Sequence, residues 1–441
     1  MQAAKVSLEE FAGIVGEGNA RPAAAGDEID GVAPEFVVEP GSVEEVSAVM
    51  KLAHDNGLKV APRGGGTKLD LGNPPQAVDL VVSTARLNRV TEHAAGDLVV
   101  LAQAGVRLED LQEQLAAESQ ALALDPPEAG ATLGGLISAD SSGPRRFRYG
   151  KVRDLLIGIT VVLGDGTISR AGGKVVKNVA GYDLCKLYTG ALGTLGIVVE
   201  TIWRLHPIPE ARATVALSVE SPESAGSAIQ SVLHSALVPS AVELEWGEGS
   251  GTLVVLLEGV EPGVKAQAGI TRSLLEPHGT VNVLADEEEQ ELWARILSPQ
   301  HESAGANGDA SAEVRVRVSG VAAAVGEYLA AIGRAAVGSG LTARASGPAG
   351  SGVLHVEFSG PVESSEEEYL AAARRAVQEL RASVAGHPAG GSVVLERAPE
   401  SLKRQIEVWG SVGGELAVMQ RMKKRFDPEF VMNPGRFVGG I

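Results

Sequence analysis

A run of three consecutive glycines is the first feature of this sequence that could bind a ligand. It lies within residues 61–72, whose centre reads Arg63, Gly64, Gly65, Gly66, Thr67 and Lys68. Glycine adopts positive φ readily and lets a backbone come close to a ligand, and successive amides in such a turn can surround phosphate oxygens. We therefore predict a phosphate-binding loop, the alternative for an isolated glycine triplet being a flexible surface turn.

Further glycine motifs follow along the same half of the chain. The region between residues 125 and 154 contains the adjacent pair Gly134 and Gly135, and a Gly-Thr-Leu-Gly motif occupies residues 193–196. This recurrence weighs against the surface-turn interpretation of the first loop.

Local patterns predict the elements that would position the first loop. A short strand within residues 33–40 is followed by a helix that begins at Ser42, with Glu45 as its capping-box partner, and ends at Gly57. Residues 58–62 then form a strand that leads straight into the glycines. In a Rossmann unit the loop precedes the helix instead, so this strand-helix-strand unit is of a different kind.

The residue pattern changes after residue 210, where the glycine motifs end. Between residues 211 and 395 strand-like and helix-like segments alternate, and they fit two rounds of the order β-α-β-β-α-β. This order predicts an antiparallel sheet with helices on one side, as in ferredoxin-like domains. A separate helix and tail occupy residues 401–441.

Composition limits the class of protein. A chain of 441 residues is long enough for two or three domains, and its 44% hydrophobic and 21% charged residues are typical of a globular protein. The net charge of -18 argues against a nucleic-acid partner. Cys185 is the only cysteine, so an internal disulfide and a cysteine-ligated iron–sulfur cluster are both excluded. We see no signal peptide and no membrane span, and we expect a cytoplasmic protein.

Together these motifs resemble a known family. Residues 62–68, the Gly134 pair, residues 143–154 and residues 193–196 look like the FAD-binding domain of the vanillyl-alcohol oxidase/p-cresol methylhydroxylase superfamily, and residues 427–436 resemble its closing segment. More narrowly, residues 177–183 and 433–441 resemble the FAD-binding E subunits of bacterial glycolate oxidases.

The resemblance implies an α+β fold in which a bipartite FAD-binding domain of this type carries an inserted ferredoxin-like, antiparallel-sheet cap domain. Its expected parts are an N-terminal helical lead-in at residues 1–33, the FAD-binding domain at 34–209, the cap or substrate domain at 210–398, and a C-terminal segment at 399–441 that returns to the FAD domain.

The resemblance also implies which residues bind FAD. The amides of the first loop would take the diphosphate, and the second glycine region would complete the site. The expected cofactor-binding residues are Arg63, Gly64, Gly65, Gly66, Thr67, Lys68, Pro126, Thr132, Gly134, Gly135, Ser138, Ser142, Gly143, Tyr149, Gly150, Asp154, Ile197 and Asn433. Members that tether FAD covalently use a His in the first loop or a Cys in the second; Thr67 stands at or beside the first position and residues 126–135 contain no Cys. We therefore expect non-covalent FAD.

Catalysis is harder to place. Oxidising a 2-hydroxy acid needs a base near the hydroxyl and a cation for the carboxylate, and the family pattern would place Lys177, Tyr182 and Arg436 near the flavin. Each also has a structural alternative. Lys177 could be a surface cation, Tyr182 a packed ring, and Arg436 a partner for a C-terminal carboxylate. Related 2-hydroxy-acid dehydrogenases carry a His-Gly-Asp-Gly-Asn-His metal stretch that is missing here, so we expect no metal and assign His355 to the core edge or solvent.

The resemblance implies oxidation of a 2-hydroxy acid such as glycolate by an FAD-binding subunit of a complex. Its partners would be a second FAD subunit and an iron–sulfur subunit, which would carry the electrons onward. Two alternatives stay open at this point. One is a self-sufficient FAD oxidase or dehydrogenase of another alcohol, and the other is a non-catalytic flavin-binding subunit that relays electrons.

Overall fold

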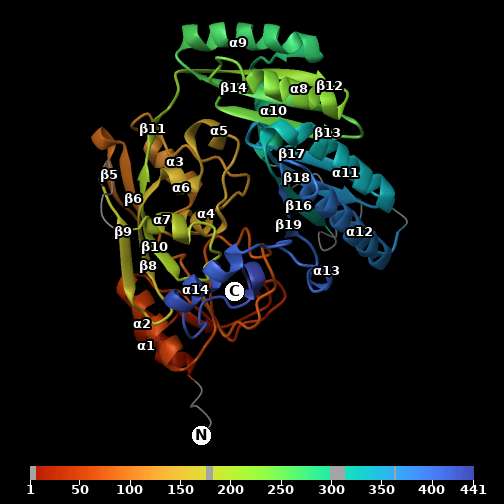
Figure 1. The fold of residues 1–441 in the computed structure, drawn as a ribbon. Coiled ribbons are helices and arrows are strands. Elements are labelled where there is room, and N and C mark those ends of the chain that lie inside the picture. Colours follow the sequence, from red (N-terminus) through yellow and green to blue (C-terminus); the bar gives the residue numbers. More distant parts are fainter. Residues whose placement is uncertain (1–5, 175–181, 298–312, 362–363) are drawn as a thin grey trace.

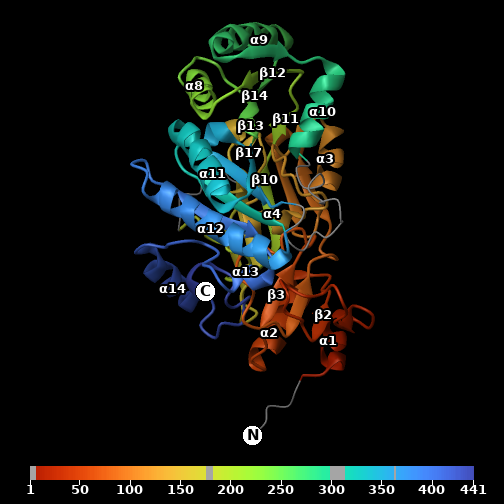
Figure 2. The same cartoon turned by 90° about the vertical axis from the view of Figure 1, so that its right-hand side faces the viewer.

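The computed structural model describes residues 6–174, 182–297, 313–361 and 364–441. Figure 1 shows two parts: an N-terminal part at the lower left, which the blue C-terminal helices adjoin, and a green-to-blue sheet with its helices at the upper right. The 90° view of Figure 2 again places the C-terminal end beside the N-terminal part. No helix among the described residues is both long enough and apolar enough to cross a membrane.

The first sheet delivers the glycine loop. It has the order β1-β2-β4-β3 and contains β1 (Ala20–Pro22), β2 (Phe36–Val38), β3 (Val60–Arg63) and β4 (Leu80–Ser83). Strands β2 and β3 both run parallel to β4. Between them lies α2 (Val43–Asp55), where the Ser42 hydroxyl accepts a hydrogen bond from the Glu45 amide at 3.1 Å. The predicted helix and its Ser42 cap are confirmed, but the capping box is not, because the Glu45 carboxylate accepts a hydrogen bond from the Gly41 amide at 2.7 Å instead of from the Ser42 amide.

The N-terminal residues belong to the same sheet. Helix α1 (Leu8–Val15) buries Phe11 and Val15, as the expected helical lead-in would, and β1 then pairs antiparallel with β2. The expected boundary between residues 33 and 34 therefore falls inside one sheet.

The second sheet is antiparallel and has five strands. Its order is β5 (Val90–Ala94), β6 (Val99–Gln103), β10 (Ile197–Arg204), β8 (Leu156–Val162) and β9 (Ile168–Gly172). The helices of this region are α3 (Leu108–Ala116), α4 (Leu133–Ala139), α5 (Arg146–Tyr149), α6 (Val152–Leu155) and α7 (Leu184–Tyr188). A small pairing of β7 (Gln120–Ala121) with β11 (His206–Pro207) leads to the cap.

The cap contains the two predicted rounds, which share one eight-stranded antiparallel sheet. The first round is β12 (Ala211–Val219), α8 (Pro222–Leu233), β13 (Ala241–Gly247), β14 (Ser250–Gly259), α9 (Glu261–Leu275) and β15 (Thr280–Val283). The second is β16 (Val314–Ser319), α11 (Val325–Ser339), β17 (Thr342–Gly347), β18 (Val353–Ser359), α12 (Glu366–Ala385) and β19 (Ser392–Arg397). Edge pairing of β13 with β17 joins them, which confirms the predicted repeat.

The helices cover the two faces of this sheet unequally. The four helices of the two rounds pack against one face and form a common core with it, and Figure 1 shows them along one side. An additional helix, α10 (Asp286–Leu297), packs Leu292 and Trp293 against the opposite face of the first round. The corresponding face of the second round is turned toward the N-terminal part.

The C-terminal segment returns to the first sheet, as expected from the family resemblance. After α13 (Glu400–Lys403) and α14 (Glu415–Phe426), residue Met432 forms a parallel bridge with Val60 of β3. The fully buried Lys423 fixes this return, because its Nζ donates to Asp427 Oδ2 at 2.6 Å and to the carbonyls of Thr194 and Met432 at 2.7 Å each.

We predict that Lys423→Met destabilises the protein by roughly 3–5 kcal/mol, since it leaves the carboxylate of Asp427 buried without its cation. Thermal denaturation should show a clear fall in the melting temperature. Arg272→Met is the matched control, because it removes the cation from another i,i+4 ion pair. The two side chains of that pair, Arg272 and Glu276, are each more than half exposed. The loss of stability in this variant should therefore stay below about 1 kcal/mol. Equal losses in both variants would contradict the role given to Lys423.

Candidate functional site

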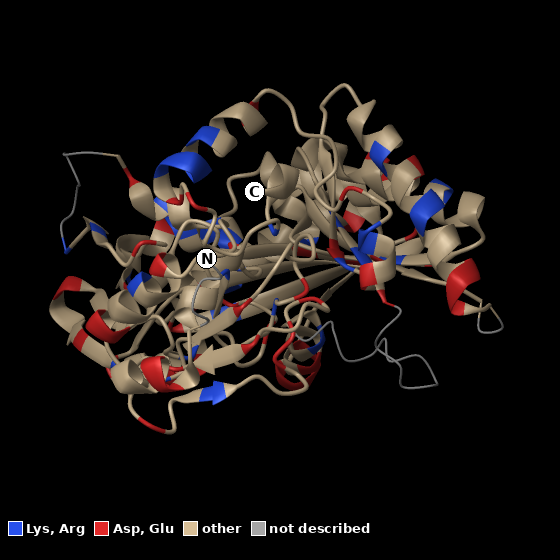
Figure 3. Ribbon diagram, turned by 90° about the horizontal axis from the view of Figure 1, so that it is seen from below, with Lys and Arg blue, Asp and Glu red and all other residues tan. Residues whose placement is uncertain are grey.

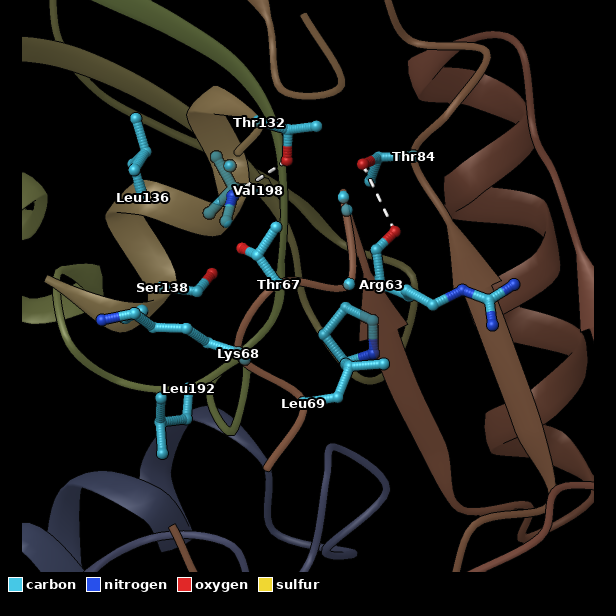
Figure 4. Close-up of a pocket in the computed structure, with 18 of the residues that line it drawn as sticks. Arg63, Thr67, Lys68, Leu69, Thr84, Thr132, Leu136, Ser138, Leu192 and Val198 are labelled. Carbon is cyan, nitrogen blue, oxygen red and sulfur yellow. Dashed lines mark hydrogen bonds between the residues drawn. The ribbon is translucent and has the colours of Figure 1, made fainter. Parts of the chain in front are cut away.

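The two glycine-rich regions face each other across a narrow space at the end of β3. A Cβ atom on Gly64 would lie 2.2 Å from Thr132 Oγ1, and one on Gly65 would lie 2.2 Å from the Gly130 carbonyl oxygen. Figure 4 shows Thr67 and Thr132 close together between these regions. Only glycine fits at positions 64 and 65. The need for glycine at these two positions therefore comes from the close packing of the two loops.

A first cavity of about 90 Å³ opens at this contact. The predicted site residues that line it are Arg63, Gly64, Gly65, Gly66, Thr67, Lys68, Thr132, Gly134, Gly135, Ser138, Ile197, Asn433 and Arg436. They come from the first loop, helix α4, the start of β10 and the C-terminal tail. The structure thus brings together segments that lie far apart in the sequence.

The first loop offers unpaired amides to this cavity. Among the described residues, no protein group accepts a hydrogen bond from the amides of Gly64, Gly65, Gly66 or Thr67. The first amides of α4 are already engaged, since Gly134 donates to the Ala104 carbonyl and Gly135 to Thr132 Oγ1. Gly64 and Thr67 are partly exposed and Gly65 and Gly66 are exposed, so the four free amides are accessible to an anionic ligand such as a diphosphate.

The charged side chains of the first loop are already paired. Arg63 Nη1 lies 2.8 Å from Asp27 Oδ1, and Lys68 Nζ lies 2.7 Å from Glu128 Oε1. The pKa of Asp27 is well below its usual range, chiefly because Arg21 donates hydrogen bonds to it, with a further contribution from Arg63. Figure 4 shows the Arg63 guanidinium turned away from Thr67 and Ser138. Binding of an anion therefore depends on the amides more than on these cations.

The charged residues in the rest of the protein do not attract an anion to the first cavity. The chain carries a net charge of -18, and Figure 3 shows acidic residues spread over many elements of the fold. An anionic ligand in the first cavity would be held locally, against the field of the whole protein.

Several expected FAD-binding residues lie outside this first cavity. Ser142 and Gly143 line a second cavity described below, whereas Pro126, Tyr149, Gly150 and Asp154 line neither. The Tyr149 ring packs edge-on against His206 at 4.8 Å between centroids, and Asp154 accepts a hydrogen bond from the Lys151 amide at the start of α6. The role of these four residues in FAD binding stays a prediction.

The three expected catalytic residues have different surroundings. Lys177 lies outside the described residues, and Tyr182 is 91% exposed and lines neither cavity. Arg436 is 3% exposed, and its guanidinium donates to the carbonyls of Leu69 and Asn73 and to Asp30. Both terminal nitrogens of Arg436 thus tie the C-terminal tail to the first loop, whereas its Nε is buried without a partner among the described residues. Its catalytic role stays a prediction.

A second cavity of about 430 Å³ adjoins the first, and Thr67, Lys68 and Glu128 line both. Its volume is within the range of small-molecule sites. Residues 142–144 form part of one wall, and the uncovered face of the cap sheet forms the other. The charged and titratable side chains of that second wall are Glu243, Glu245, Arg295, Arg315, Arg344, His355, Glu357, Glu396 and Arg397.

Sequence reasoning missed this wall, although the pattern was present. In β16 valines at positions 314, 316 and 318 are fully buried while Arg315 and Arg317 alternate with them. In β18 His355 and Glu357 alternate with core residues in the same way. Alternation identifies which side chains face away from the helices, but only the fold shows that this face borders the glycine loop.

His355 and Glu396 form an ion pair in the cavity wall. His355 Nδ1 lies 2.6 Å from Glu396 Oε2, and Arg317 Nη1 lies 3.7 Å from Glu396 Oε1. Burial alone would raise the pKa of Glu396, but His355, Arg317 and Lys68 outweigh it and lower that pKa well below its usual range. The described residues contain no group of three or more His, Cys, Asp or Glu side chains that could hold a metal.

Free positive charge is also present. Arg344 extends from β17 into the second cavity, and within the described chain it makes no ion pair or hydrogen bond. A free guanidinium can bind a carboxylate through two parallel hydrogen bonds.

The fold is of the vanillyl-alcohol oxidase/p-cresol methylhydroxylase type, as comparison with solved structures shows. A p-cresol methylhydroxylase with substrate bound superposes with a TM-score of 0.77 at 16% identity, over 97% of this chain and 95% of that one. An alkyldihydroxyacetonephosphate synthase gives 0.70 at 18% identity, over 92% and 78%.

Sequence comparison identifies the family. The FAD binding domain family matches residues 34–172, and the family of FAD linked oxidases, C-terminal domain, matches residues 245–437. The chain belongs to the FAD-linked oxidases defined by these two domains, and it is an FAD-dependent oxidoreductase.

Curated relatives extend along most of the chain. Glycolate oxidase subunit GlcD of Bacillus subtilis is 27% identical over 91% of this chain and 88% of its own length. The D-lactate dehydrogenase of Archaeoglobus fulgidus is 29% identical over 91% of both chains. The D-2-hydroxyglutarate dehydrogenase of Xanthomonas citri is 27% identical over 91% of this chain and 89% of its own. These names differ in substrate, and the narrower resemblance to E subunits stays a prediction.

We predict that Gly65→Ala sharply reduces FAD binding, because the added Cβ would overlap the Gly130 carbonyl and force the two loops apart. The ratio of bound flavin to protein after purification, and titration with FAD, should show at least about tenfold weaker binding, which corresponds to roughly 1.4 kcal/mol. Gly65→Asp should be worse, since it adds a negative charge.

Gly96→Ala is the matched control, because a Cβ at that glycine meets no atom within 4 Å. FAD binding by Gly65→Ala at the level of this control would contradict the assignment of the loop.

Proposed function

We propose that this protein oxidises a small 2-hydroxy acid to the corresponding 2-oxo acid as the FAD-binding subunit of a glycolate oxidase-type complex. The observation that carries the proposal is the second cavity, in which the free cation Arg344 lies on the cap wall opposite the glycine loop. A carboxylate-bearing substrate of a few carbon atoms fits its volume and its charge.

The proposal places FAD along the two adjoining cavities, with its diphosphate at the amides of Gly64 to Thr67 and its ring toward residues 142–144. When bound there, the flavin would supply acceptance of a hydride. The chain's own residues would orient the acid: Arg344 would bind the substrate carboxylate, and the walls of the cavity would limit access of water.

The proposed partners follow from the chemistry of electron removal. Cys185 is the only cysteine of the chain, and it is buried, with a pKa that burial raises to about 11. This chain therefore cannot ligate an iron–sulfur cluster through cysteines. We propose that a second FAD subunit and an iron–sulfur subunit take the electrons, in a cytoplasmic complex whose membrane contacts are made through the partners.

The alternatives differ in what the isolated chain can do. A stand-alone oxidase or dehydrogenase would turn over alone with an artificial acceptor, whereas an electron-relay subunit would not react with any acid. The relatives include both a subunit of an oxidase and enzymes named as dehydrogenases.

We predict that glycolate, D-lactate or D-2-hydroxyglutarate bleaches the FAD of the loaded protein under anaerobic conditions. Arg344→Met should weaken the apparent affinity for the acid by about 10- to 100-fold, as expected when a charge-assisted hydrogen bond is lost. Arg334→Met is the matched control, since Arg334 is an exposed arginine of α11 that lines neither cavity. A flavin that stays oxidised with all three acids would contradict the catalytic proposal and favour the relay.

We also predict that the FAD is not covalently attached. The position in the first loop that would need a histidine is occupied by Thr67, and residues 125–135 contain no cysteine. Precipitation of the FAD-loaded protein with acid should leave the yellow colour in the supernatant. Colour retained in the washed pellet would disprove this prediction.

A further inference from the structure

One buried carboxyl group in the wall of the second cavity has no partner. Glu243 of β13 is 2% exposed, it lines the cavity, and its Oε1 atom is enclosed without a hydrogen bond among the described residues. Burying a polar group without a partner costs free energy, and exceptions of this kind in folded proteins call for an explanation.

Three other carboxylates that line this cavity are paired. Glu245, two residues along the strand, forms an ion pair with Arg295 at 2.8 Å, and Glu396 is paired with His355. Glu128 is paired with Lys68. Glu243 has no bound cation. Glu357 of β18 lacks one as well, but it is partly exposed, whereas Glu243 is buried.

The surroundings of Glu243 favour its binding a proton. Its pKa is raised well above its usual range by burial and, to a smaller extent, by Asp125, while Arg146 of α5 opposes the shift. The residue paired with it on β14 is the apolar Val254. Arg145 does not neutralise Glu243, because its guanidinium is bound to Glu258 at 2.8 Å.

The other charged groups near this position lie across the sheet. They are Arg344 of β17, His355 and Glu357 of β18, Glu396 of β19 and Arg317 of β16, the last of which lies near Arg146 and Lys151. Because His355 and Arg317 lie against Glu396, Arg344 is the cation of this group that stays available for an anionic substrate.

We propose that Glu243 is the catalytic base of this site and accepts the hydroxyl proton of the 2-hydroxy acid. This inference rests on the proposed function. In the reaction the C–H bond breaks and its electron pair passes with the hydrogen to the flavin as hydride. The O–H bond breaks, its proton binds a carboxylate oxygen of Glu243, and the C–O bond becomes the C=O of the 2-oxo acid. The proton then leaves to solvent.

The position of Glu243 suits this role in two ways. Glu243 and Arg344 line the same cavity, so that a substrate held by Arg344 would lie in the cavity whose wall contains the base. An unpaired buried carboxylate also has a higher proton affinity than one in an ion pair, which makes it the stronger general base of the two.

The test compares FAD-loaded wild type with Glu243→Gln, Glu243→Asp and Glu289→Gln. Glu289 is a buried carboxylate of the cap whose oxygens bind Thr214 and Arg212 outside the cavity, so its variant is the matched control. The rate of anaerobic flavin bleaching by D-lactate and glycolate is measured from pH 5 to 9, and binding of oxalate is followed by the change in flavin absorbance.

The base must be deprotonated to act, so the wild-type bleaching rate should rise with pH through the raised pKa of Glu243 and fall below it. Glu243→Gln should retain FAD and bind oxalate within about threefold of wild type, but bleach about 10²-fold or more slowly, without this pH dependence. Glu243→Asp should restore part of the rate and its pH dependence. The control variant should keep the wild-type profile.

Three results would overturn the inference. Bleaching by Glu243→Gln at the wild-type rate and pH profile would remove the base role while leaving the proposed function intact. Loss of FAD or oxalate binding in parallel with the rate would show that Glu243 is structural. Failure of the acids to bleach wild-type flavin would reject the proposed function, and the base role with it.

Discussion

The feature on which this structure depends is a turn whose amides are left free. The amides of Gly64 to Thr67 have no acceptor among the described residues, and the packing of Gly64 and Gly65 against Thr132 and Gly130 holds the turn in that conformation. Successive amides of one turn that lack a protein acceptor can together surround the oxygens of an anion. The loop is therefore preorganised for an anion, and a dinucleotide diphosphate is the ligand that this family binds.

The surrounding structure fixes the position of that turn from both ends of the chain. Asp30, in the N-terminal stretch, pairs with Lys403 at 2.8 Å and with Arg436 at 3.2 Å, and Arg436 also holds the carbonyl of Leu69 just beyond the loop. The Lys423 and Asp427 pair then joins the tail to the Gly-Thr-Leu-Gly turn. The FAD domain is formed by two separate pieces of sequence, and buried ion pairs connect these pieces into one site.

The sequence predicted the elements whose signals are local. Ser42 and Glu45 give the cap of α2, and alternation of strand-like and helix-like segments gives the double round of the cap domain. Long-range contacts carry no such signal: nothing near Arg436 shows that its partner is Asp30, and nothing near Tyr149 shows that its ring packs against His206. Glu243 was missed for the same reason. That no cation lies against its carboxylate depends on elements that are distant in the sequence.

The most direct test of the account is a crystal structure of the protein with FAD bound. The account predicts diphosphate oxygens within hydrogen-bonding distance, about 2.7–3.2 Å, of the amides of Gly64 to Thr67, with the flavin ring at the second cavity. A bound FAD whose diphosphate lies elsewhere, with these four amides facing solvent, would contradict it.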